Sequence, residues 1–167
     1  MASASRATET TEADRIADQL ERAFEGDAWN GPTVSEILTG ISAEQAASRP
    51  LPAVHTIWEL VRHSAAWLRT VRQRLQGQEV CELPEEVNWP ETTDPSPIAW
   101  AETIEELRRE YELLREEALT WGRKDLESTP EGERYTAYEM LHGVIQHLYY
   151  HAGQIAILKR ADPGVGK

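Results

Sequence analysis

The most constraining feature of the sequence is a series of apolar residues spaced alternately four and three residues apart over residues 100–121. The series is Trp100, Ile104, Leu107, Tyr111, Leu114, Ala118 and Trp121. This spacing places all the side chains on one face of an α-helix, and its average of about 3.5 residues is typical of helices that pack lengthwise against other helices. Ser96 followed by Pro97 predicts the start of this helix, and Gly122 predicts its end.

Three further long helices are predicted from apolar stripes at helical spacing. They begin after Thr11, Thr56 and Thr136 and are followed by Gly26, by Gly77, and by Pro163 with Gly164. Thr56 and Thr136 each stand three residues before a glutamate, which is the spacing of a capping box. The stripe of the last helix is Ala137, Met140, Val144, Leu148, His151, Ile155 and Leu158. Each of these helices therefore has one face to bury.

The connectors between the helices differ in character. The first contains two capped helical turns, which begin at Thr33 and Ser42. The second, from Gln78 to Pro95, is rich in proline and interrupts any helix. We therefore predict an all-α fold, a four-helix bundle with short helical turns in the first connector. It forms one domain over residues 11–162, after a disordered polar segment over residues 1–10.

The charge and hydropathy of the chain make two classes of partner unfavourable. The formal net charge is -12, from 29 acidic and 17 basic residues, and the basic residues are scattered among the acidic ones. A phosphate backbone would be repelled, so we expect no nucleic-acid partner. Apolar patterns are all interrupted by charges, so we expect no membrane partner. The single cysteine, Cys81, and the lack of an apolar leader favour a cytoplasmic location.

Two histidines lie on the inner face of the last predicted helix. If Val144 is set at zero and each residue turns by about 100°, His151 lies near -20° and His147 near -60°, whereas His142 lies near 160°. His147 and His151 are thus one turn apart on one face, as in helical H-x-x-x-H metal sites. His142 points away from them.

A third ligand is expected from another helix. His63 lies at the edge of the apolar stripe of the helix after Thr56, from which it can reach inward. A buried imidazole that lacks a partner costs about 1 to 3 kcal/mol, and a shared metal ion would satisfy one nitrogen of each ring. A lone inward histidine is more often a satisfied core residue than a metal ligand, so the spacing alone does not establish the site. His55 is interpreted as a helix-entry residue. Cys81 is not expected to act as a nucleophile.

Longer segments carry a resemblance to a known family. These are AWNGPTVSEIL (28–38), HTIWELVRHSAAW (55–67), NWP (88–90) and HGVIQHLYYHAGQIAILKR (142–160). With them the chain resembles the DinB/YfiT-like metal-binding four-helix bundles, described as metal-dependent hydrolases or thiol S-transferases. The resemblance implies an up-down-down-up topology, a homodimer, and a nickel or zinc ion on His63, His147 and His151. Three neutral imidazoles suit either ion, and also iron or copper.

The resemblance also implies a class of reaction. Relatives transfer a low-molecular-weight thiol of the bacillithiol or mycothiol type to an electrophile, so a small-molecule substrate and a thiol co-substrate are expected. Three protein ligands leave an open position, which is typical of a catalytic site, and hydrolysis remains the alternative reaction. Glu59, one turn before His63, is a weak candidate for a general base. The rival interpretations are a non-catalytic metal-binding protein with a structural site, and a protein that acts through its dimer surface.

Overall fold

The computed structural model describes residues 10–80, 83–92 and 94–161. Cys81, Pro163 and Gly164 lie outside these residues, as does nearly all of the segment expected to be disordered. Within the described residues, all regular secondary structure is helical, which confirms the all-α prediction.

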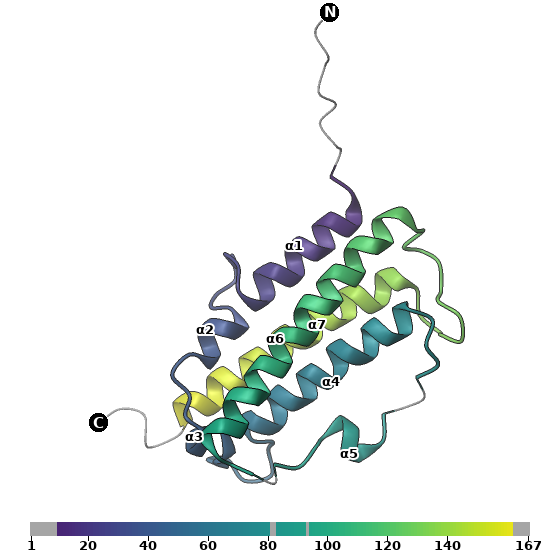
Figure 1. The fold of residues 1–167 in the computed structure, drawn as a ribbon. Coiled ribbons are helices and arrows are strands. Elements are labelled where there is room, and N and C mark those ends of the chain that lie inside the picture. Colours follow the sequence, from purple (N-terminus) through teal and green to yellow (C-terminus); the bar gives the residue numbers. More distant parts are fainter. Residues whose placement is uncertain (1–9, 81–82, 93, 162–167) are drawn as a thin grey trace, which may run out of the picture.

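Four long helices dominate the fold (Figure 1). They are α1 (Glu12–Phe24), α4 (Ile57–Leu75), α6 (Pro97–Thr120) and α7 (Ala137–Ala161). The short helices are α2 (Val34–Leu38), α3 (Ala43–Ala47), α5 (Glu85–Asn88) and the 3-10 turn η1 (Trp121–Arg123). The predicted helical turns of the first connector are α2 and α3, and Gly122 lies inside η1 rather than beyond a helix end.

Side-chain caps fix where the helices begin. Thr11, Thr33 and Thr56 each form a complete capping box with the residue three positions later. Ser96 accepts from the amide of Ala99 before Pro97, and Thr136 exchanges hydrogen bonds with Glu139. Such caps satisfy amide groups that a helix start otherwise leaves unpaired, at about 1 kcal/mol each. The helix starts were therefore readable from the sequence.

The four long helices lie side by side (Figure 1). The buried apolar residues of all four belong to one core cluster. α4 contacts both α6 and α7, and α1 contacts the same two helices. Six of the seven stripe residues of α6 are buried, and all seven of α7 are. Burial of these side chains at about 25 cal/mol per Å² of apolar area is the main force that holds the helices together.

The proline-rich connector departs from the prediction, because it contains the short helix α5. No proline stands between Pro84 and Pro90, which leaves room for one helical turn. α5 packs against α4 and brings Asn88 and Trp89 next to that helix. Residues 85–89 of the connector are therefore part of the packed structure.

A buried carboxylate joins α4 to α6. The side chain of Glu110 is only 3% exposed and forms ion pairs with Arg69 (3.1 Å) and Arg72 (3.0 Å). Because a buried charge is costly unless it is paired, this contact fixes how the two helices face each other. The hydropathy pattern of α6 did not single out Glu110.

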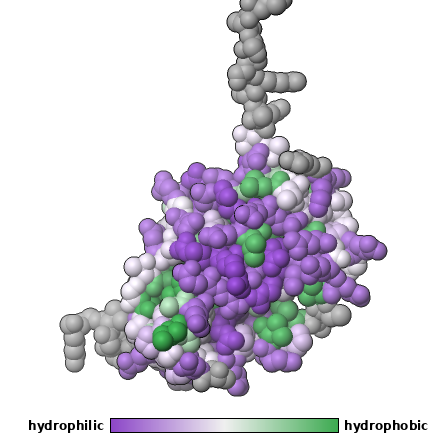
Figure 2. Space-filling view, viewed as in Figure 1, coloured by the Kyte–Doolittle hydropathy of each residue, from purple (hydrophilic) through white to green (hydrophobic). Residues whose placement is uncertain are grey.

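The surface is largely hydrophilic on the face seen in Figure 2, where hydrophobic residues form small separate patches. None of the helices in the described part has the length and apolar character that crossing a bilayer requires.

Candidate metal centre

His63, His147 and His151 come together between α4 and α7, and we refer to them as the trihistidine cluster. One ring nitrogen of each lies within 4.8 Å of the other two. Nε2 of His147 is 3.1 Å from Nε2 of His63 and 3.0 Å from Nε2 of His151. Two nitrogens bound to one zinc ion at about 2.1 Å lie at most about 4.2 Å apart, so these two separations suit a shared ion, and the remaining pair, within 4.8 Å, would draw together slightly around it.

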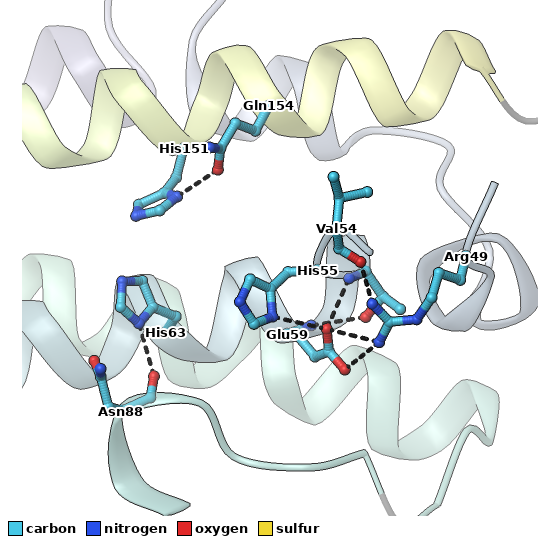
Figure 3. A network of polar contacts seen from close by, with 9 residues as sticks. Arg49, Val54, His55, Glu59, His63, Asn88, His151 and Gln154 are labelled. Atoms are coloured by element: carbon cyan, nitrogen blue, oxygen red, sulfur yellow. Dashed lines mark hydrogen bonds and ion pairs between the residues drawn. The ribbon is translucent and has the colours of Figure 1, made fainter. Parts of the chain in front are cut away.

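The elements that carry the cluster explain why it forms. His147 and His151 stand one turn apart on α7, so their rings lie on the same side of that helix. His63 reaches them from α4, which packs against α7. Figure 3 shows His151 facing His63 across the gap between the two helices. The convergence that the sequence predicted is present.

The tautomer of His63 is fixed by a backbone acceptor. Its Nδ1 lies 2.7 Å from the carbonyl oxygen of Asn88, at the end of α5 (Figure 3). A carbonyl oxygen only accepts hydrogen bonds, so Nδ1 carries the proton and donates it. Nε2 of His63 therefore presents a bare lone pair to the cluster.

His151 is oriented in the same way by its own helix. Its Nδ1 lies 2.8 Å from Oε1 of Gln154, which places the amide oxygen as the acceptor (Figure 3). Nε2 of His151 then also presents a lone pair. His147 differs, because its buried Nδ1 has no hydrogen-bond partner among the described residues.

The trihistidine cluster consequently has fewer N–H donors than nitrogen lone pairs. Only Nε2 of His147 is left to donate, and one N–H group cannot fully satisfy the two lone pairs that flank it. His63 and His151 are each only 4% exposed, so water access is small. An unsatisfied buried acceptor costs about 1 to 3 kcal/mol. A cation at the point where the three nitrogens meet would remove that cost, so the residues fit a metal ion.

Protonation does not offer an equivalent solution at neutral pH. Burial, with a smaller contribution from the neighbouring imidazoles, lowers the pKa of His63 to about 4 and that of His147 to about 3. Burial also lowers the pKa of His151. All three rings are therefore neutral near pH 7, which is the form that binds metal ions.

Two tryptophans enclose the cluster. The indole of Trp89 lies parallel to the imidazoles of His63 and His55, with ring centroids 3.7 and 3.6 Å apart. Trp67 lies 5.6 Å from His147 and donates to the side-chain oxygen of Asn88. Neither Trp89 nor Asn88 was predicted to lie at the site, although both belong to the NWP segment on which the resemblance rests.

Glu59, the weak candidate for a general base, has several partners. Its carboxylate contacts Nη2 of Arg49 at 2.8 and 3.1 Å, the amide of Thr56 at 2.8 Å and Nδ1 of His55 at 3.1 Å (Figure 3). These contacts leave little free acceptor capacity for a substrate proton. The geometry favours a positioning role, and the catalytic assignment of Glu59 stays a prediction.

The remaining candidates fall outside the cluster. His142 contacts Tyr138 at a centroid distance of 4.3 Å, and is not part of the metal-compatible group. His55 is not part of this group either. It lies just before α4, and its ring stacks on the indole of Trp89.

In a comparison with models of protein families, the model of the DinB superfamily matches residues 28–155. The chain belongs to the DinB superfamily. No curated protein and no solved structure matches it.

The DinB match spans most of the chain, including all three cluster histidines and the α5 connector. It confirms the family that the sequence segments indicated. Together with the buried histidines, it supports metal binding by this DinB-superfamily protein.

Proposed function

We propose that this protein is a metal-dependent transferase that joins a low-molecular-weight thiol, of the bacillithiol or mycothiol type, to an electrophile. His63, His147 and His151 would hold one divalent transition-metal ion, with nickel and zinc as the first candidates. The observation that carries the proposal is the meeting of three Nε2 atoms, two of them on buried rings, with at most one hydrogen among them. Such an ion lowers the pKa of a thiol or a water molecule that it binds.

The residues around the cluster would keep it ready for such a ligand. Asn88 and Gln154 hold His63 and His151 with their Nε2 lone pairs inward. Trp89 covers one side of His63 and excludes water from that ring. Among the residues that the structure describes, three protein ligands are at hand, which leaves a position for a small molecule.

The family resemblance also supports an assembly. We propose that the four long helices form an up-down-down-up bundle, that two chains pair as a homodimer, and that the protein acts in the cytoplasm. The ribbon supports the topology, since α4 and α6 run in one direction and α1 and α7 in the other (Figure 1). Sedimentation at several protein concentrations would test the dimer.

The experiment that tests the function is a thiol-consumption assay with metal-loaded protein. Bacillithiol, mycothiol, glutathione and cysteine are each incubated with alkylating and epoxide electrophiles, and the loss of free thiol is followed. We expect a metal-dependent rate with at least one thiol, which His151→Ala abolishes. If His151→Ala stays folded and consumes thiol at the wild-type rate, the transferase proposal is wrong.

Two other functions remain as alternatives. In a hydrolase the same open position would hold water, and ester or amide cleavage would replace thiol consumption. In a non-catalytic metal-binding protein the ion would only stabilise the fold. His151→Ala would then unfold at a markedly lower temperature, and neither assay would show turnover.

A further inference from the structure

A groove opens beside the trihistidine cluster, between the C-terminal half of α4 and the N-terminal half of α7, and we refer to it as the apolar groove. Its volume is about 440 Å³. The residues that line it include Trp67, Val71, Met140, Gly143, Val144 and His147. Because His147 belongs to both the groove and the cluster, a molecule in the groove would lie directly against the proposed metal centre.

The walls of the apolar groove offer a ligand mainly apolar contacts. Most of its lining is apolar, and its two charged residues already have partners within the protein. Arg74 forms an ion pair with Glu133 at 3.4 Å, and the carboxylate of Glu139 accepts from the amide of Thr136 at 2.8 Å. No unpaired charge is offered to a ligand, so the groove suits a neutral molecule. Its volume is typical of small-molecule sites, which span ~300 to 1,000 Å³.

A glycine lies at the centre of the groove-facing side of α7. At about 100° per residue, Gly143 falls between Glu139 and His147 around the helix axis. A Cβ atom at Gly143 would meet no atom within 4 Å, so the space in front of it is open. Glycine inside a helix costs about 1 kcal/mol relative to alanine. The missing side chain therefore leaves room in the groove at some expense of helix stability.

We propose that the apolar groove binds the alkyl or aryl body of a neutral electrophile, with its reactive carbon toward His147. This inference rests on the proposed function, and it gives the binding site of the electrophile, one of the two substrates of that reaction. The thiol co-substrate carries polar and charged groups, so we place it outside these apolar walls. In the reaction the thiol sulfur forms a bond to that carbon, the bond from the carbon to its leaving group breaks, and the thiol proton leaves with the leaving group.

The test fills the groove without touching the cluster. Gly143→Leu projects a side chain into the open space, and Gly153→Leu is its matched control. Gly153 lies on the same helix about 180° farther round from Val144, and it also has open space in front of it. Leucine favours helix more than glycine does, so both variants should fold. Circular dichroism during thermal unfolding verifies this.

Binding is measured with N-phenyl-1-naphthylamine, a neutral aromatic probe whose fluorescence rises in apolar surroundings. We expect the wild-type chain and Gly153→Leu to bind it equally, and Gly143→Leu to bind it at least ten-fold more weakly. Equal affinity in all three proteins would place the probe elsewhere, such as the groove of about 360 Å³ lined by Leu51 and Ile157, and would overturn the proposal. Absence of binding to the wild type would overturn it too.

The outcome is separable from that of the proposed function, because the probe is titrated into both metal-free and metal-loaded protein. If the protein binds the probe in the groove but binds no metal, the transferase proposal is wrong and the groove proposal stands. If the protein binds metal on the three histidines but does not bind the probe, only the groove proposal is wrong. With an active electrophile, Gly143→Leu should raise KM far more than it lowers kcat.

Discussion

Gln154 and His151 stand three residues apart on α7, and the amide oxygen of Gln154 accepts the Nδ1 proton of His151 across 2.8 Å. This contact fixes which nitrogen of His151 faces the trihistidine cluster. Residues that orient metal-binding imidazoles in this way typically contribute 10- to 100-fold to metal affinity.

Gln154→Leu should therefore weaken zinc or nickel binding by about 10- to 100-fold, because it removes the acceptor while it retains a side chain of similar size. Gln154→Glu, which restores an acceptor, should recover most of the affinity. Gln146→Leu is the control, since Gln146 is exposed on the same helix. Competition titration against a metal-binding dye measures all four proteins. Equal affinity of the wild type and Gln154→Leu would show that the contact does not orient His151.

Removal of any one cluster histidine should abolish stoichiometric metal binding. Wild-type protein purified without an affinity tag is expected to hold about one metal ion per chain, whereas His63→Ala, His147→Ala and His151→Ala should hold nearly none. His142→Ala should keep the wild-type content, because His142 contacts Tyr138 and is not part of the cluster. Elemental analysis after gel filtration gives the result. A full metal content in His63→Ala would rule out a shared site between α4 and α7.

The metal-free protein should lose stability as the pH falls below about 6.5. The pKa values of His63 and His147 are lowered to about 4 and about 3 in the folded chain, so the unfolded chain binds more protons in this range. The stability is fully present above pH 6.5 and is lost progressively as the pH falls to about 3. Each imidazole contributes up to about 1.4 kcal/mol per pH unit.

The comparison for this pH effect is a variant in which all three cluster histidines are changed to glutamine. Urea unfolding of both metal-free proteins at several pH values gives the two slopes. The slope of the wild type should be the steeper one between pH 6.5 and 4, because the carboxylates common to both proteins cancel. Parallel slopes would mean that the three imidazoles are not held neutral by burial.

Glu110→Gln should destabilise the protein by about 1 to 3 kcal/mol, since it removes the charge that pairs with Arg69 and Arg72 between α4 and α6. Glu112→Gln, at an exposed position of the same helix, should change the free energy of unfolding by less than about 0.5 kcal/mol. Chemical denaturation measures both. A Glu110→Gln variant as stable as the wild type would show that desolvation of the three charges offsets their attraction.

The features that the sequence predicted correctly are those encoded within one helix. Apolar spacing and capping residues such as Thr56 are local signals, so the long helices and their starts could be identified. The inward direction of His147 and His151 follows from the 3.6-residue turn alone. Even the approach of His63 required only that its helix present its apolar edge to α7.

The features that the sequence did not reveal depend on contacts between distant segments. Asn88 and Trp89 lie in a connector with no periodicity, and only the packing of α5 against α4 places them at His63. The pairing of Glu110 with two arginines of α4 likewise depends on how α4 and α6 face each other. The apolar groove is lined by residues of both α4 and α7, and no motif marks Gly143, whose missing side chain leaves space in it.

The acceptor that orients His63 is a peptide carbonyl rather than a side chain, and any amino acid at position 88 supplies the same oxygen. Substitutions at position 88 would therefore keep this acceptor, even though they remove the bond that Trp67 donates to the Asn88 side chain. Shortening or lengthening the connector by a single residue would shift the carbonyl away from the imidazole. The genetic signature of this contact is thus a tolerance of substitutions combined with an intolerance of insertions and deletions.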